Sequence, residues 1–219
     1  GAYHLYGMIV DRYPNILFEH CASGGGRFDM GMLSYCPQIQ ASDSNDAVER
    51  VFINYASTYG YPLSSIGSHA FSGALLPYYA KCAIALFGTY GYEMNPVNLN
   101  KEDIVQINEI AELYKKYHLD CIQNGDLYRM ESPYETNHMS MICVAKNKEK
   151  AIAIFFNKRR ESNLSRFIKF DGLDDETLYQ NSLDGKIYSG KQLRLVGINL
   201  IKWLEEFETI VITFDKVEN

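Results

Sequence analysis

Three residues of this chain combine a reactive side chain with a position where a predicted strand passes into a loop. They are Cys21, Asp43 and His69, and a predicted helix follows each loop. A carboxyl group in such a place can act as a general acid or base, and a thiol beside an imidazole can act as a nucleophile. Because ligands bind at the carboxyl ends of parallel strands, the three side chains could converge on one pocket.

Each of these residues also has an ordinary structural interpretation. Cys21 could be a small buried hydrophobe, and its strand would turn His20 to the opposite face, which argues against thiol catalysis. His69 could be a histidine of the core. Asp43 could form an Asx turn, but it is not needed as a helix cap, because Asp46 supplies the cap of the helix that follows.

The segment CASGGGRFD, residues 21–29, contains three consecutive glycines. A phosphate-binding loop would need a helix N-terminus aimed at the anion, and this segment lacks a convincing helix after it as well as a GKS or GxGxxG context. A flexible linker fits poorly, because both flanks are apolar and are predicted to be structured. We therefore expect the glycines to allow a close approach of the backbone to a substrate or a neighbouring strand.

The first 124 residues alternate predicted strands and helices. Helices are predicted at residues 2–13, 46–59, 77–88 and 101–118, and strands at residues 16–22, 38–41, 63–72 and 89–96. The alternation is typical of a doubly wound sheet or of a (β/α)8 barrel. About four units make half of an eight-unit barrel, so a doubly wound sheet and a partial barrel both remain open.

From residue 125 onward the pattern changes to short strands separated by turns and charged tips. The predicted strands are LYRM, SMICVAK, AIAIFF, RFIKF, LYQNSL, KIYSG, LRLVGI and TIVITF, and WLEEFE is at most a turn. We therefore expect an α/β plus all-β chain of two domains: residues 1–124 form the α/β part, and residues 125–219 form an antiparallel β domain.

Composition excludes several classes of partner and site. The 219 residues are 47% hydrophobic, which allows a core, and the net charge of -6 with scattered Lys and Arg predicts neither nucleic acid nor an anionic membrane as a partner. No apolar run approaches the roughly 20 residues of a membrane span, and we expect a cytoplasmic protein. Five irregularly spaced cysteines form no zinc-like pattern, so neither a metal nor another cofactor is expected.

Two segments together carry a resemblance to a known family. CASGGGRFD and then SDSNDAVER resemble the C-[AS]-[SG]-G-G-G-R-x-D and P-Q-I-W-T-S-D-x-x-D-A-x-x-R segments of the α-galactosidases of glycoside hydrolase family 36. The likeness continues through YPLSSIGSH, ALFGTYGYEMN and GDLYRMESPYE, so it covers most of the chain. It implies a retaining glycosidase that removes terminal α-galactosyl units from oligosaccharides of the melibiose or raffinose type.

The resemblance also implies a fold, an assembly and roles for individual residues. It implies the C-terminal half of a (β/α)8 TIM barrel as the catalytic part at residues 1–124, and a sandwich-like C-terminal β domain at residues 125–219. It also implies a homo-oligomer, a tetramer. Asp43 would be the general acid/base, and Cys21 with the backbone around Ser23 and Gly24 would line the galactose pocket. Three further side chains are candidates for the same pocket: Arg27, Gln40 and His69.

The sequence departs from the family pattern in two places. The K-W-D-x-N segment that carries the family's nucleophile does not occur, so we expect these residues to be the C-terminal part of a longer enzyme and to be inactive alone. Gln40 and Ala41 replace the family's Trp and Thr, which removes an apolar wall. Two alternatives remain: a transglycosylating relative, and a non-catalytic module that binds carbohydrate or forms oligomers.

Overall fold

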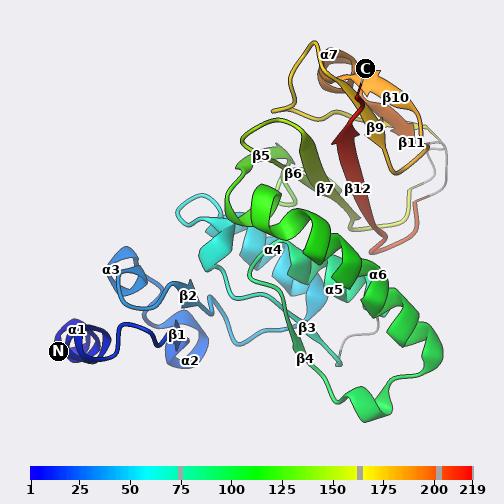
Figure 1. Cartoon of the computed structure of the whole chain (residues 1–219). Coiled ribbons are helices and arrows are strands. Elements are labelled where there is room, and N and C mark those ends of the chain that lie inside the picture. Colours follow the sequence, from blue (N-terminus) through cyan, green and yellow to red (C-terminus); the bar gives the residue numbers. More distant parts are fainter. Residues whose placement is uncertain (74–75, 162–164, 201–203, 219) are drawn as a thin grey trace.

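The computed structural model describes residues 1–73, 76–161, 165–200 and 204–218 (Figure 1). Its N-terminal part contains α1 (Ala2–Arg12), β1 (Glu19–His20), α2 (Ala22–Gly25), α3 (Met30–Leu33), β2 (Gln38–Ile39), α4 (Ala47–Ser57), a 3₁₀ turn (Leu63–Ser65), β3 (His69–Phe71), α5 (Tyr78–Leu86), β4 (Gly91–Glu93), a second 3₁₀ turn (Pro96–Asn98) and α6 (Lys101–Tyr117). A short π-helix, His118–Gln123, leads into the C-terminal part. The predicted helices at residues 2–13, 46–59, 77–88 and 101–118 are confirmed within one to three residues at each end.

Four strand segments of the N-terminal part lie parallel to one another in chain order. β1 pairs with β2, and β3 pairs with β4. A parallel bridge between Ile39 and Ile66 joins the two pairs, and the Gly67 N–H donates to the Ile39 carbonyl at 2.9 Å. The carboxyl ends of all four segments therefore lie on the same edge, where each leads into a loop or a helix.

Local capping explains where α4 and α6 begin. Asp46 caps α4 by accepting hydrogen bonds from the N–H groups of Val48 and Glu49, as predicted. Asn100 and Asp103 form a reciprocal capping box at the start of α6. Because Asp46 supplies the cap of α4, the segment between β2 and that cap is free to present Asp43.

The C-terminal part is rich in antiparallel sheet. Its elements are β5 (Asp126–Glu131), β6 (His138–Val144), β7 (Lys150–Asn157), β8 (Arg166–Ile168), β9 (Leu178–Asn181), β10 (Ile187–Ser189), α7 (Gly190–Leu195), β11 (Ile198–Leu200) and β12 (Thr209–Lys216). Six strands form one sheet in the order β10-β9-β12-β7-β6-β5, and β8 pairs with β11 in a separate two-stranded sheet.

The six-stranded sheet separates two apolar clusters. One face carries Met139, Met141, Cys143, Ile152, Ile154, Phe156 and Val211, which share a cluster with residues of α4, α5 and α6. The other face carries Ile142, Val144, Ala151, Ala153, Phe155, Ile212 and Phe214, which share a cluster with β8, β11 and α7. Every residue of β6 is buried, because both faces of the strand are covered.

Three local expectations from the sequence are wrong. The first half of the predicted strand LRLVGI belongs to the helix α7, because Ser189 and Gln192 form a capping box that starts a helix there. The predicted strand at residues 63–72 is strand only at His69–Phe71, since Ser65 Oγ donates to the Pro62 carbonyl and closes a 3₁₀ turn. A helix does follow the glycines: α3 begins at the Asp29 side chain, which accepts from the Met32 N–H at 2.9 Å.

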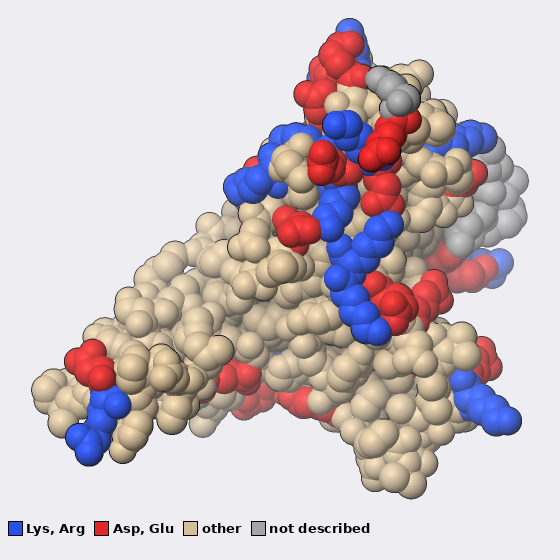
Figure 2. Space-filling view, in the orientation of Figure 1, with Lys and Arg blue, Asp and Glu red and all other residues tan. Residues whose placement is uncertain are grey.

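Polar and apolar surfaces are unevenly distributed. Figure 2 shows Lys and Arg interspersed with Asp and Glu over the C-terminal part, whereas the N-terminal end is mostly uncharged on this face. Within α1 no residue is buried, and Leu5 and Met8 are 57% and 58% exposed. The described part of WLEEFE contains a turn at residues 206–207, while its Trp203 lies outside the described residues. Among those residues, no helix is long and apolar enough to cross a membrane.

Candidate active site

Two of the three reactive residues at the strand ends are in contact. Cys21 directly follows β1, and Asp43 lies in the irregular segment between β2 and α4. Cys21 Sγ lies 3.5 Å from Asp43 Oδ1, a weak hydrogen bond from a thiol to a carboxylate. The Asp43 side chain is exposed and Cys21 is half-buried, so both are accessible to a ligand at this edge.

The glycine segment packs against the chain that carries Asp43. Ser23, Gly24 and Gly25 have φ angles of 55°, 75° and 86°, a left-handed turn that glycine adopts without strain. A Cβ on Gly25 would lie 2.4 Å from the Ala41 carbonyl oxygen, and one on Gly24 would lie 3.3 Å from Asp43 Oδ2. The predicted close approach is thus confirmed, and its partner is the segment that follows the neighbouring strand.

Arg27 and His20 form a separate contact on the side of α1. Arg27 Nε donates to His20 Nε2 at 3.1 Å, and His20 Nδ1 lies 3.4 Å from the hydroxyl of Tyr6 in α1. Arg27 also lines a hollow with residues 1–4 and Asp29. The structure therefore directs the Arg27 guanidinium toward His20 rather than toward the contact between Cys21 and Asp43.

Gln40 is buried under the Asp43 segment and does not form an open wall. It is 6% exposed. In the orientation of the side-chain amide that matches donors with acceptors, the nitrogen donates to the Gly67 carbonyl at 3.0 Å and the oxygen accepts from Arg50 Nη2 at 2.7 Å. Gln40 therefore links two strand ends below the site.

Arg50 is a functional candidate that sequence reasoning missed. This guanidinium of α4 is 1% exposed. Nη2 donates to the Ser42 carbonyl at 2.6 Å and to Asn45 Oδ1 at 3.0 Å, and Nη1 donates to the Gly67 carbonyl at 3.2 Å. In the sequence, Arg50 lies among the apolar positions of the predicted helix, beside Val51. An arginine at such a position is the signal that could have revealed it, because arginine is seldom buried without partners.

Glu93 is the second candidate that was missed, and it accounts for the position of His69. Glu93 ends β4, and its Oε1 lies 2.7 Å from His69 Nδ1. Its Oε2 accepts from Asn45 Nδ2 at 2.6 Å. His69 therefore does not contact Cys21 or Asp43 through any described hydrogen bond, but joins the same edge through Glu93 and Asn45.

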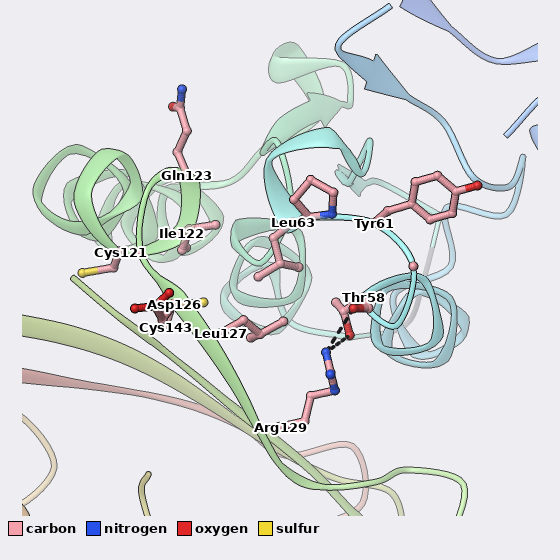
Figure 3. A pocket seen from close by; sticks show the side chains of 13 residues that line it. Thr58, Tyr61, Leu63, Cys121, Ile122, Gln123, Asp126, Leu127, Arg129 and Cys143 are labelled. Carbon is pink, nitrogen blue, oxygen red and sulfur yellow. Dashed lines mark hydrogen bonds between the residues drawn. The ribbon is translucent and has the colours of Figure 1, made fainter. Parts of the chain in front are cut away.

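A separate hollow lies away from this strand-end site. It has a volume of about 340 Å³ and lies between the loop after α4, the π-helix and strands β5 and β6 (Figure 3). Arg129 Nη1 donates there to the Thr58 carbonyl and hydroxyl at 3.0 and 3.1 Å. Asp43 precedes α4 and Thr58 follows it, so about 16 Å of helix separates this hollow from the strand-end site.

The two thiols in this hollow are unsuited to nucleophilic chemistry. Burial raises the pKa of Cys121 to about 12, and it also raises the pKa of Cys143. Both side chains are 1% exposed. A neutral buried thiol is a poor nucleophile, so the strand-end site around Asp43 remains the better candidate. In the described part of the chain, no group of three or more His, Cys, Asp or Glu is placed to hold a metal ion.

Comparisons with known proteins identify the family. The profile of the Melibiase family matches residues 1–125, and that of the glycosyl hydrolase family 36 C-terminal domain matches residues 138–214. The chain belongs to glycoside hydrolase family 36. The resemblance carried by the two motifs is therefore confirmed.

Relatives of this family 36 chain are named as α-galactosidases. The bifunctional α-galactosidase/sucrose kinase AgaSK of Mediterraneibacter gnavus is 33% identical over 225 residues, which cover 100% of this chain and 24% of that protein. The crystal structure of the α-galactosidase from Lactobacillus brevis superposes with a TM-score of 0.94 at 31% identity, covering 100% of this chain and 31% of that one. A variant of AgaA from Geobacillus stearothermophilus, solved with raffinose, gives a TM-score of 0.92 at 31% identity over 99% of this chain and 31% of that one.

This family 36 chain spans about a quarter of the length of the curated relatives it matches. It also spans about a third of the solved chains. The similarity extends over both its parallel strand ends and its C-terminal sheet.

Proposed function

We propose that this family 36 chain forms the acid/base side of the active site of a retaining α-galactosidase. The observation that carries the proposal is the placement of the exposed Asp43 carboxyl group at a strand end, beside Cys21 and the left-handed turn at Gly24. In support, the relatives are named as α-galactosidases, and one was solved with raffinose. Terminal α-galactosyl units of oligosaccharides are the proposed substrate.

Asp43 would act twice in a double displacement. As a neutral acid it would protonate the departing glycosidic oxygen while a second carboxylate attacks the anomeric carbon. As the resulting base it would then remove a proton from water, which hydrolyses the glycosyl-enzyme intermediate. Its exposed position and its lack of a helix-capping duty leave it available for both steps.

The nucleophile in this proposal comes from another part of the enzyme. A retaining glycosidase needs a second carboxyl group about 5 Å from the acid/base. Among the described residues, Glu93 is a carboxylate at a later strand end, that of β4, and both of its oxygens are engaged by His69 and Asn45. We therefore propose that the 219 residues do not turn over substrate on their own.

The proposed architecture is the C-terminal half of a (β/α)8 barrel at residues 1–124, followed by a sandwich-like β domain at residues 125–219. The parallel strands in chain order support the first part, and the six-stranded sheet with its smaller second layer supports the other. The apolar residues exposed on α1 would pack against the rest of the barrel. In this arrangement the strand ends of both halves would surround one substrate.

The galactose pocket would be lined by Cys21 and by the backbone at Ser23 and Gly24. The left-handed turn lets a sugar approach the backbone closely, since Gly24 carries no side chain beside Asp43. Gln40 would support the floor from below, because it is buried and bonded to Gly67. Arg27 would contribute indirectly, through His20.

The central experiment uses the full-length gene product and two substrates. We expect Asp43→Ala to lower kcat/KM for raffinose by about 10²- to 10⁴-fold, the usual contribution of a general acid. Azide should partly restore kcat with an activated aryl α-galactoside, because it can replace water without needing a base. Glu49→Gln, an exposed carboxylate of α4, is the matched control and should leave both activities unchanged. Full activity of Asp43→Ala on raffinose would remove Asp43 from this role.

Two alternatives lead to different products or to none. A transglycosylating relative would transfer galactose to an added acceptor sugar in preference to water, and product analysis by chromatography would reveal this. A non-catalytic module would bind galactosides without cleaving them even in the full-length protein. A homo-oligomer is also part of the proposal, and light scattering after size-exclusion chromatography measures it directly.

A further inference from the structure

The segment that carries Asp43 is held from both sides by one guanidinium. Asp43 lies in the irregular chain between β2 and α4, and its side chain is exposed. Arg50 Nη2 donates to the Ser42 carbonyl, one residue before Asp43, and to Asn45 Oδ1, two residues after it. The Ser44 N–H also donates to Ser42 Oγ at 3.1 Å, so this turn has few remaining degrees of freedom.

Arg50 can hold this segment only if its buried charge is balanced. The side chain is 1% exposed, and burial lowers the pKa of Arg50. Among the groups that oppose this effect, Glu93 contributes most, followed by Asp43 and Cys21. Glu93 is thus the main counter-charge of Arg50, although no direct ion pair joins them among the described residues.

Glu93 reaches Arg50 through Asn45. Glu93 Oε2 accepts from Asn45 Nδ2 at 2.6 Å, and Asn45 Oδ1 accepts from Arg50 Nη2 at 3.0 Å. The other carboxylate oxygen of Glu93 lies 2.7 Å from His69 Nδ1, which fixes the orientation of the carboxylate. The Asp43 segment is therefore tied to β3 and β4 as well as to its own helix.

We propose that Glu93 is a positioning residue for the acid/base step, because it holds Asn45 and Arg50 in the arrangement that aims Asp43 at the departing oxygen. This inference rests on the proposed α-galactosidase function. It predicts a specific change in kcat/KM, because a general acid that is misplaced by about 1 Å loses much of its catalytic effect. A substrate whose leaving group needs no protonation should be far less sensitive to Glu93 than one that does.

The experiment compares kcat/KM of the full-length gene product for raffinose and for a 2,4-dinitrophenyl α-galactoside. Because kcat/KM reports the steps through the first bond cleavage, it isolates protonation of the leaving group from the later hydrolysis of the intermediate. We expect Glu93→Ala to lower kcat/KM for raffinose by about 10- to 100-fold and for the aryl galactoside by less than about threefold.

A conservative variant and a matched control complete the design. Glu93→Gln can still accept from Asn45 and can donate to His69, but it removes the negative charge that helps to balance Arg50. Its kcat/KM for raffinose should therefore lie between that of Glu93→Ala and that of wild type. Glu49→Ala, another exposed carboxylate, should change neither substrate. Thermal unfolding of each variant shows that the protein is folded.

Each contrary result has a definite meaning. Equal losses of Glu93→Ala on both substrates would assign Glu93 a purely structural role and overturn the inference. So would wild-type kinetics of Glu93→Ala, or a Glu93→Gln variant as impaired as Glu93→Ala. If the wild-type protein cleaves neither galactoside, then it is the proposed function that fails, and this outcome is distinguishable because it precedes any comparison of variants.

Discussion

The Sγ atom of Cys21 lies 3.5 Å from Oδ1 of Asp43, across the ends of two neighbouring parallel strands. A contact of this length is a weak hydrogen bond, which identifies Cys21 as a neighbour of the carboxyl group. His20, the nearest imidazole in sequence, is buried and bonded to Arg27. No histidine among the described residues is therefore seen to activate this thiol.

We expect Cys21→Ser to lower kcat/KM of the full-length protein for raffinose by less than about tenfold, the value of one ordinary hydrogen bond. Asp43→Ala should be much more damaging. Steady-state kinetics of the two variants side by side provide the measurement. If Cys21→Ser were as inactive as Asp43→Ala, a covalent role for the thiol would have to be considered.

Gly25 should tolerate no side chain. Its φ of 86° is left-handed, and a Cβ would lie 2.4 Å from the Ala41 carbonyl oxygen, so backbone must move to admit it. We expect Gly25→Ala to lower the free energy of unfolding by about 2 kcal/mol or more, from strain and overpacking together. Gly60→Ala is the matched control, because nothing lies within 4 Å of a Cβ there. Urea unfolding curves of both variants test the contrast.

Buried histidines should make the fold sensitive to mild acid. Burial lowers the pKa of His118, whose Nε2 donates to the Gly88 carbonyl at 2.9 Å, and it also lowers the pKa of His138. Below about pH 6.5 these histidines bind protons in the unfolded chain but remain neutral in the folded protein. The free energy of unfolding therefore falls as the pH falls. The slope is at most about 1.4 kcal/mol per pH unit for each histidine.

The urea midpoint should therefore drop between pH 7 and pH 5.5. His118→Gln keeps a donor for Gly88 but cannot be protonated, so it should make the drop smaller. His4→Gln, on the exposed side of α1, is the control and should leave the drop unchanged. An equal drop in wild type and His118→Gln would exclude His118 as a cause.

The inner face of the sheet should couple the two parts of the chain. Phe156 is fully buried in the cluster that also contains residues of α4, α5 and α6, and Tyr79 of α5 accepts a hydrogen bond from the Val211 N–H of β12. We expect Phe156→Ala to cost about 3 to 5 kcal/mol. Hydrogen exchange should show α5 and β7 losing protection together. Loss in β7 with full protection of α5 would mean that the parts unfold independently.

Much of the fold could be read from the sequence because its patterns are local. The helix predicted at residues 101–118 and the cap at Asp46 both depend on residues close together in sequence, and both are confirmed. The segment LRLVGI was misread because its apolar residues fit a strand as well as one turn of helix. The deciding signal was the capping pair Ser189 and Gln192, which lies at the edge of the run.

The site was only partly predictable, because its parts meet across strands. The Asp43 segment and the glycine turn could be recognised from two contiguous motifs. The link from Glu93 through Asn45 to Arg50 depends on the pairing of β3 with β4 and on the bridge from Ile39 to Ile66, and no local pattern encodes either. Arg50 alone carried a visible sign, as a charge within an apolar stripe.

The alternation of side chains along β7 has a practical consequence for anyone who modifies this protein. Ile152 and Ile154 belong to the cluster that includes residues of the helices α4, α5 and α6, whereas Ala151 and Ala153 belong to the cluster on the other face of the sheet. Substitutions at neighbouring positions of β7 therefore alter the packing of different apolar clusters. Ala151 and Ala153 face the cluster that contains residues of β8, β11 and α7. The C-terminal part can therefore be redesigned on that face of the sheet while the geometry around Asp43 is left intact.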